Sequence, residues 1–240
     1  MNKLIVTAFF ILFSLYTKAG WYEVYTYDGI LAGKKVHFSL QFREINSTSK
    51  DSILVTGIYK YNHINEPLEL RGFLINNDSL KLQEYHNEES FADITFKWNN
   101  GDLVGLWENT QKKYSVKLKN VGKLTDLDAD NSNPPTEILM STCFDNEYLV
   151  GIYEKLQSDD RAKMVALLVK SKKSNIVLQR INFDFEERPI GNVMTVIFEN
   201  AITDKYKGGK MIEVTVDDGR MGESFLMKFN EQENKFILDN

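Results

Sequence analysis

The chain has 240 residues, of which 42% are apolar and 26% charged, with a formal net charge of −5 at neutral pH. This length suffices for one large domain or two small ones. The excess of negative charge disfavours nucleic acid and anionic lipid as partners, and it is compatible with a cationic protein partner. Because Cys143 is the only cysteine, an intramolecular disulfide is excluded.

Residues 1–19 have the pattern of a cleaved secretory signal peptide. Lys3 provides a positive start, an apolar run follows, and Ala19 supplies a small residue at the expected cleavage point. The apolar run is shorter than the roughly 20 residues that span a bilayer, so we expect cleavage rather than a retained anchor. Loss of Lys3 and Lys18 then lowers the formal net charge from −5 to −7. The mature protein is expected to be soluble and either periplasmic or secreted.

Aromatic residues gather just after the predicted cleavage point. Tyrosine and tryptophan are over-represented in binding hot spots, so this cluster is a candidate protein-contact surface. The alternative is a strand whose rings pack on the core. The cluster consists of Trp21, Tyr22, Tyr25 and Tyr27.

Alternating apolar and polar residues over 36–42, and again over 53–118, predict half-buried strands. The polar face of the first of these strands is expected to face solvent; its residues are His37, Ser39, Gln41 and Arg43. Short polar turns separate the runs, so successive strands should be antiparallel neighbours. The pattern therefore predicts a β-meander.

Three glycines interrupt the predicted strands rather than the turns: Gly57, Gly72 and Gly105. Glycine inside a strand is typical of a bend, a bulge or a close backbone approach. We therefore expect the meander to close into a small barrel or a strongly coiled sheet.

The strand series over 34–120 contains Gly-x-Tyr, Leu-x-Leu-x-Gly, Leu-x-Leu-x-Glu and Gly-x-Trp motifs. They occur as Gly57-Ile58-Tyr59, Leu68-Glu69-Leu70-Arg71-Gly72, Leu80-Lys81-Leu82-Gln83-Glu84 and Gly105-Leu106-Trp107. This series resembles a group of uncharacterised exported bacterial β-meander proteins, although Phe91-Ala92 stands where that group often has Thr-Gly. The resemblance implies a β-meander fold and export to a bacterial envelope. It assigns no catalytic residue.

Residues 122–137 are acidic, rich in asparagine and contain Pro134 and Pro135, which is typical of an interdomain linker. Four acidic residues in this segment have the spacing of positions 1, 3, 5 and 12 of an EF-hand calcium loop. Position 6 is Asn131 instead of glycine, and neither flank has a helical pattern. An ordinary acidic linker and a calcium site both stay open. The candidate calcium ligands are Asp126, Asp128, Asp130 and Glu137.

The second half of the chain is also rich in β-branched and aromatic residues. Its most ambiguous segment, 161–173, also fits a short helix, and we predict a strand. Gly57-Ile58-Tyr59 reappears as Gly151-Ile152-Tyr153, and Leu82-Gln83 reappears as Leu178-Gln179. These matches suggest a diverged internal duplication. The predicted fold is all-β, with one antiparallel meander unit over residues 20–121 and a second over residues 138–240.

Motifs of common catalytic and cofactor sites are missing from the sequence. His37, His63 and His86 lack metal-ligand spacing. The nucleophile elbow, the phosphate-binding loop and the dinucleotide fingerprint do not occur. Neighbouring acids point to opposite faces of a strand, so the adjacent acid pairs are poor candidates for cooperating carboxylates. We therefore predict a protein that is not an enzyme and needs no cofactor other than calcium, if the acidic loop binds it.

Two functions fit this pattern. The first is a non-catalytic exported binding protein that recognises another protein, such as an inhibitor or immunity factor against an enzyme that acts on the envelope. The alternative is a lipocalin-like carrier that holds a small apolar ligand inside a barrel.

Overall fold

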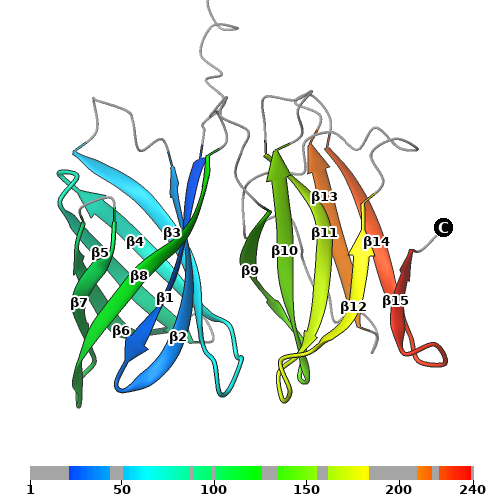
Figure 1. Ribbon diagram of the computed structural model, residues 1–240, viewed down its shortest axis with the longest axis horizontal. Coiled ribbons are helices and arrows are strands. Elements are labelled where there is room, and N and C mark those ends of the chain that lie inside the picture. The colour runs from blue at the N-terminus through cyan, green and yellow to red at the C-terminus, as the bar shows by residue number, and fades with distance from the viewer. Residues whose placement is uncertain are drawn as a thin grey trace, which may run out of the picture.

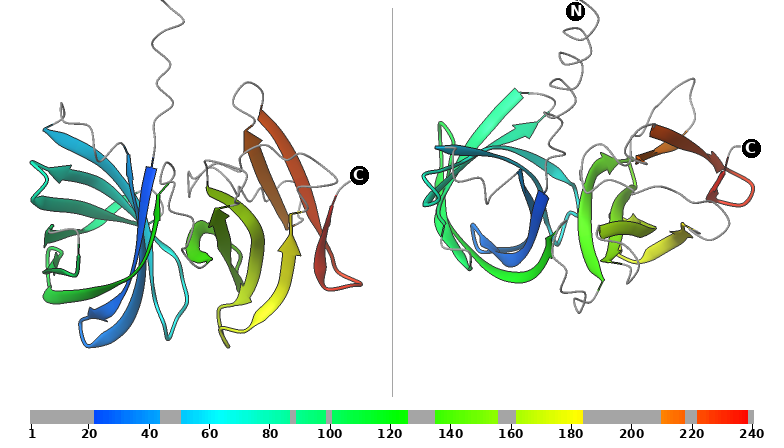
Figure 2. Two further views of the ribbon diagram at one scale, coloured as in Figure 1. Left: turned by 45° about the horizontal axis from the view of Figure 1, so that its top comes forward. Right: turned by 90° about the horizontal axis from the view of Figure 1, so that it is seen from above.

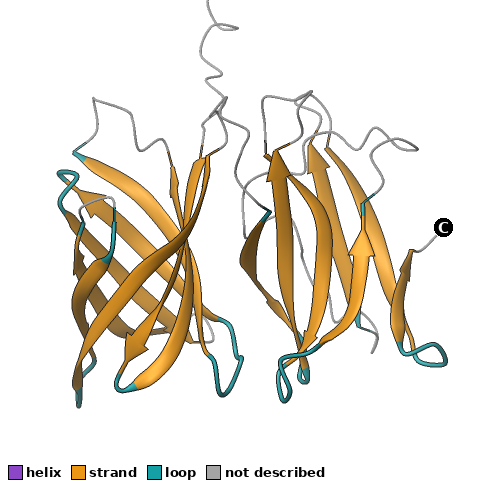
Figure 3. Cartoon of the chain, in the orientation of Figure 1, coloured by secondary structure: helices purple, strands orange, loops and turns teal. Residues whose placement is uncertain are grey.

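The computed structural model describes residues 22–43, 51–86, 89–98, 101–125, 135–155, 162–183, 210–217 and 222–238. In these ranges every regular element is a β-strand, which confirms the predicted all-β class (Figure 3). The described residues contain no helix that is long and apolar enough to cross a membrane. The strands are β1 (Tyr22–Leu31), β2 (Lys34–Arg43), β3 (Ser52–Tyr61), β4 (Leu68–Ile75), β5 (Ser79–His86), β6 (Glu89–Lys97), β7 (Leu103–Glu108), β8 (Lys113–Thr125), β9 (Thr136–Cys143), β10 (Glu147–Lys155), β11 (Ala162–Ser171), β12 (Val177–Asn182), β13 (Met211–Asp217), β14 (Gly222–Asn230) and β15 (Lys235–Leu238).

Strands β1 to β8 form a closed antiparallel barrel in which each strand pairs with the next and β8 pairs with β1 (Figure 1). Short turns explain this order. Ala32 and Gly33 join β1 to β2 with φ values of 51° and 75°, and Asn76 and Asn77 join β4 to β5 with φ values of 49° and 52°. Glycine and asparagine tolerate the positive φ seen at Gly33, Asn76 and Asn77, and such tight turns force antiparallel pairing. The predicted first meander is therefore a closed barrel.

Side chains from all eight strands meet inside the barrel, as period-two alternation requires. Phe38 stacks on Tyr59 with ring centroids 4.6 Å apart, and Phe96 meets Phe38 edge to face. All three side chains are at most 1% exposed. Each fully buried side chain of this size contributes about 1.5–3 kcal/mol to folding. Interior packing is therefore the main stabilising term of the barrel.

The glycines inside the strands allow the wall to curl. A Cβ added at Gly72 would lie 1.9 Å from the carbonyl oxygen of Lys81, and one added at Gly105 would lie 2.0 Å from that of Thr95. The ring of Phe96, opposite Gly105 on the neighbouring strand, covers the gap left by the missing side chain. Close backbone approach thus requires glycine at both positions.

The second half contributes two antiparallel sheets, one of four strands in the order β12-β11-β10-β9 and one of three in the order β13-β14-β15. One face of the four-stranded sheet packs on Ile58 of the barrel wall. The other face packs on β13–β15 in a core that also includes Val24 and Leu124 of the barrel. Figure 2 shows the resulting layers, with the four-stranded sheet between the barrel and β13–β15. The predicted strand within 161–173 is confirmed as β11.

The middle of the outer face of β2 is covered, which contradicts the expectation that this face meets solvent, whereas Arg43 at its end is exposed as expected. Ser39 is fully buried and Gln41 is 3% exposed. The hydroxyl of Ser39 accepts a hydrogen bond of 3.2 Å from the backbone N–H of Leu139 on β9. The expectation was wrong because a polar strand face has the same sequence pattern whether water or another sheet covers it.

The boundary between the halves lies between β8, which runs on to Thr125, and β9, which begins at Thr136. In the second half the described strands form two sheets and not a closed barrel. The matched residues Leu82 and Leu178 also differ, since Leu82 is buried inside the barrel whereas Leu178 is 52% exposed on β12. The internal duplication stays a prediction.

Candidate functional site

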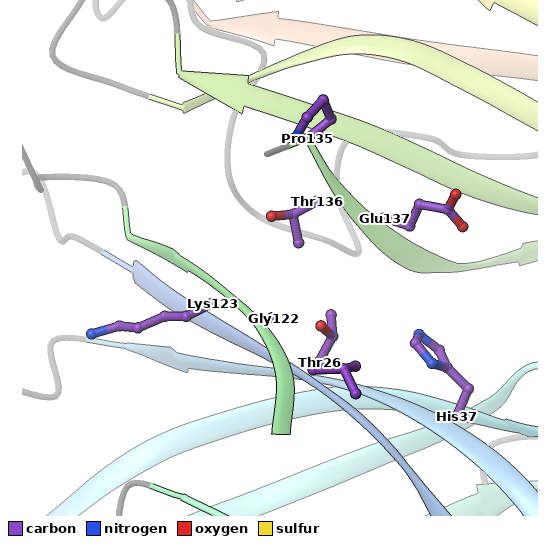
Figure 4. Close-up of a pocket in the computed structure, with 8 residues that line it drawn as sticks. Thr26, His37, Gly122, Lys123, Pro135, Thr136 and Glu137 are labelled. Atoms are coloured by element: carbon purple, nitrogen blue, oxygen red, sulfur yellow. The ribbon is translucent and has the colours of Figure 1, made fainter. Parts of the chain in front are cut away.

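A pocket of about 410 Å³ lies where the outer wall of the barrel meets the start of β9. Figure 4 shows Thr136 facing Thr26 across the pocket, with Lys123 toward one end and His37 and Glu137 toward the other. Four strands contribute to the pocket: β1, β2, β8 and β9. Its lining residues are Thr26, His37, Val121, Gly122, Lys123, Pro135, Thr136 and Glu137.

A local irregularity in the barrel wall shapes this pocket, which we call the junction pocket. The register between β1 and β8 shifts between Thr26 and Tyr27. A Cβ added at Gly122 would lie 2.6 Å from the Thr26 hydroxyl. Glycine therefore lets β8 pass close to Thr26, and a bulge at such a point redirects side chains.

The junction pocket carries charge of both signs. His37 Nδ1 lies 2.8 Å from a carboxylate oxygen of Asp28, and this hydrogen bond holds the pKa of Asp28 below its usual value. At the other end, the ammonium of Lys123 lies 3.4 Å from the Glu23 carboxylate. No hydrogen bond joins either pocket threonine to His37 in the part of the chain that the structure describes. The pocket therefore offers donors and acceptors for a polar ligand, without the nucleophile–base contact that covalent catalysis uses.

A buried lysine lies beside this pocket, at the contact between the barrel and the second half. Lys60 is 6% exposed, and its ammonium donates a 2.6 Å hydrogen bond to Asn65 and lies 5.3 Å from the centre of the Tyr148 ring. Burial, reinforced by repulsion from Lys170, lowers the pKa of Lys60 to about 8. Asn65 in turn donates to the backbone carbonyl of Lys172, 2.8 Å away. This chain of contacts ties the β3–β4 turn to the second half.

Cys143 lies in the same contact region. Its sulfur is 3.6 Å from a Glu66 oxygen and 3.6 Å from the Lys172 ammonium, which itself pairs with Glu66 at 2.6 Å. Burial raises the pKa of the Cys143 thiol. A half-buried thiol with a raised pKa is a poor nucleophile, because the thiolate is the reactive form.

Two rings of the predicted aromatic contact surface are buried in the barrel core. Trp21 lies outside the described residues, and Tyr22 begins β1. Tyr25 and Tyr27 point into the barrel and are 5% and 0% exposed. Tyr25 packs edge to face on Trp98 with centroids 5.3 Å apart. These two rings belong to the core because residues two apart on a strand share one face.

The predicted calcium ligands are only partly described. Asp126, Asp128 and Asp130 lie outside the described residues. Glu137 is exposed on β9 and lines the junction pocket. Within the described ranges, no group of three or more His, Cys, Asp or Glu side chains is placed to hold a metal ion. The calcium site stays a prediction.

Sequence reasoning missed most of the junction pocket. Thr26 and Thr136 have no distinctive pattern, and His37 was assigned to a solvent-facing surface. Gly122 was the one available signal, since glycine next to a predicted strand end often marks a bulge. No family model, curated protein or solved structure matches the chain.

Proposed function

We propose that the protein is a non-catalytic exported binding protein that recognises another protein, as an inhibitor or immunity factor against an envelope-acting enzyme would. The observation that carries this proposal is a group of exposed apolar side chains on the outer wall of the barrel. Single exposed apolar residues are ordinary, whereas neighbouring ones are typical of an interaction surface.

These side chains form two pairs on the outer wall of the barrel, with β5 and β6 between the pairs. Leu54 lies opposite Phe73 across β3 and β4, and Leu106 and Val104 share the outward face of β7. Lys81 and Thr95 lie between the two pairs: Phe73 is opposite Lys81, Lys81 is opposite Thr95, and Thr95 is opposite Leu106. The four apolar residues are 41–60% exposed and form what we call the outer band: Leu54, Phe73, Val104 and Leu106.

Lysines lie within and beside the outer band. Lys81 is opposite Phe73, and Lys97 and Lys117 flank Val104 on either side. The net negative charge of the chain supports a partner that is cationic overall. The lysines themselves favour carboxylates on the part of the partner that touches the band. The charge-reversed variant Lys81→Glu shows whether the contact face of the partner is acidic or basic. It weakens binding to an acidic face and strengthens binding to a basic one.

The test starts with mature protein, purified and immobilised, and envelope extracts from the source cell and its competitors. A captured protein is purified, and its affinity is measured for the wild type, Phe73→Asp and Leu106→Asp. The matched control is Val177→Asp, at an exposed apolar position on β12. We expect at least about tenfold weaker binding, roughly 1.4 kcal/mol, for the band variants only. Equal affinity in all variants, or no capture at physiological salt, contradicts the proposal.

The carrier is the second candidate, and a closed eight-stranded barrel favours it, because barrels of this size hold either their own side chains or one small ligand. Buried side chains from every strand already occupy the described interior. A large apolar ligand would have to displace them. Native mass spectrometry of protein recovered from its own envelope tests this function, with a retained lipid-sized adduct as the supporting result. A chelator arm tests calcium in the same experiment.

A further inference from the structure

One end of the barrel holds a buried carboxylate among aromatic rings. Glu84 on β5 points inward and is 4% exposed. One of its oxygens accepts hydrogen bonds from the Tyr59 hydroxyl at 2.7 Å and from the Trp107 indole N–H at 2.6 Å. Ala92 lies directly opposite on β6. Ala92 is the smallest side chain of the barrel core.

The two donors to Glu84 are neutral, and this distinguishes it from the buried carboxylate at the other end of the barrel. Glu23, also 4% exposed, accepts from the Tyr25 hydroxyl and has the Lys123 ammonium 3.4 Å away. Glu84 has no ion-pair partner in the part of the chain that the structure describes. A buried charge is costly unless an opposite charge compensates it. Glu84 is therefore a candidate partner for a positively charged ligand.

The end of the barrel at which Glu84 lies is less completely buried than the opposite end. The half-buried core side chains Tyr61, Leu68 and Tyr114 all belong to this end, whereas Phe42 and Trp98 at the opposite end are buried. The β3–β4 and β7–β8 connections lie at the less buried end, toward the bottom of Figure 1.

Aromatic faces surround the approach to the carboxylate. Trp107 and Tyr114 have ring centroids 5.6 Å apart, and Tyr59 and Tyr61 have centroids 5.7 Å apart. Phe91, which is 53% exposed, extends the group 6.1 Å beyond Trp107. Aromatic faces attract cations, and this attraction strengthens when water is excluded. Burial and the neighbouring Glu84 charge raise the pKa of Tyr59, so its hydroxyl stays a hydrogen-bond donor.

We propose that this end of the barrel binds a small organic cation, a primary amine or a quaternary ammonium. The charged group lies against Glu84, and the rings of Tyr61, Trp107 and Tyr114 enclose the alkyl part. This site is separate from the outer band, so it does not depend on the proposed protein partner. It also differs from the apolar-carrier hypothesis, because charge and not apolar volume selects the ligand.

The test uses the indole N–H resonance of Trp107 in the mature protein, assigned with the Trp107→Phe variant. Choline and phenethylamine are titrated beside their neutral counterparts, 3,3-dimethylbutanol and 2-phenylethanol. We expect at least one of the two cations to shift the Trp107 signal in a saturable way and to bind at least about tenfold more tightly than its neutral counterpart. The Trp98 signal, from the opposite end of the barrel, should stay in place.

Variants separate charge recognition from packing. Glu84→Gln keeps an oxygen acceptor for Tyr59 and Trp107 but removes the charge, and we expect it to lose at least about nine-tenths of the affinity for the cation. Glu23→Gln is the matched control and should bind like the wild type. If Glu84→Gln does not fold, Tyr114→Leu takes its place, with the same expected loss. Equal binding of cations and neutral counterparts, or no Trp107 shift over the full solubility range of both cations, overturns the proposal.

Discussion

The barrel and the sheets beyond it bury their side chains in different ways. Inside the barrel, the apolar cluster comes from β1 to β8 alone. Strands β9 to β11 of the second half are covered on both faces, whereas β12 is mostly exposed. Both clusters that cover them include barrel residues: Ile58 on one side, and Val24 and Leu124 on the other. The difference indicates that the barrel is self-sufficient in its core, whereas the β9–β12 sheet relies on the barrel for part of its burial.

The largest expected effect comes from removing a central ring of the barrel. Phe38→Ala should lower the free energy of unfolding by about 4 kcal/mol, because the variant loses burial and leaves a cavity between Tyr59 and Phe96. Urea unfolding followed by tryptophan fluorescence measures this loss. If the second half relies on the barrel, the Cys143 thiol should become reactive in the same transition. Exposure of Cys143 only at higher urea would show that the second half stays folded without the barrel.

A smaller effect is expected at the contact between the two halves. Ile58→Ala removes the fully buried barrel residue that packs on β9–β11, and the expected loss is about 3 kcal/mol. Cys143 should also react faster with a thiol reagent under native conditions, because the contact loosens. Ile30→Ala, at a barrel position that is 43% exposed, is the control and should change stability by less than about 0.5 kcal/mol. Equal effects of the two changes would contradict a buried contact at Ile58.

The curl of the barrel wall depends on close backbone approach at Gly72. Gly72→Ala forces a methyl group against the carbonyl of Lys81, and the expected loss of unfolding free energy is about 2 kcal/mol. Thr95→Ala is the control, because it also places alanine in the barrel wall, at an exposed position on β6. A neutral effect of Gly72→Ala in chemical unfolding would mean that the wall shifts without cost at this position.

The sequence predicted the barrel better than it predicted the sites, for a physical reason. Period-two alternation and turn residues such as Asn76 and Asn77 are local signals, so they locate strands and antiparallel pairs. The covering of Ser39 and Gln41 comes from β9, far along the chain, and no local pattern records it. The junction pocket is likewise assembled from four separate strands, so only Glu137 among the candidate site residues lies in it.

Glu84 is different, because a local signal for it was present. It continues the alternation of Leu80 and Leu82 on β5, and this spacing places its side chain on the same inward face. An acidic residue at an inward position is unusual and is a reason to look for a binding site. The Leu-x-Leu-x-Glu motif that ends in Glu84 predicts a strand, and this structural meaning conceals the carboxylate.

The contact between the halves also predicts a pH dependence of stability. Lys60 is buried at this contact, and its pKa of about 8 in the folded protein lies below the ordinary value of 10.5. Below about pH 8 the side chain is charged in both states, so its burial fully opposes folding. Between about pH 8 and pH 10 the unfolded chain holds the proton that the folded protein has lost, so stability should rise with pH by about 1–2 kcal/mol.

Lys60→Met isolates this contribution. The variant keeps a long side chain beneath Tyr148 but cannot titrate, so its stability should lack the rise between about pH 8 and pH 10. Urea unfolding midpoints of wild type and variant, compared from neutral pH to about pH 9.5, measure the difference. Lys117→Met, at an exposed position on β8, is the control for the same change of side chain away from the contact. Parallel profiles for wild type and Lys60→Met would mean that Lys60 is hydrated, and therefore that the two halves do not pack tightly at this contact.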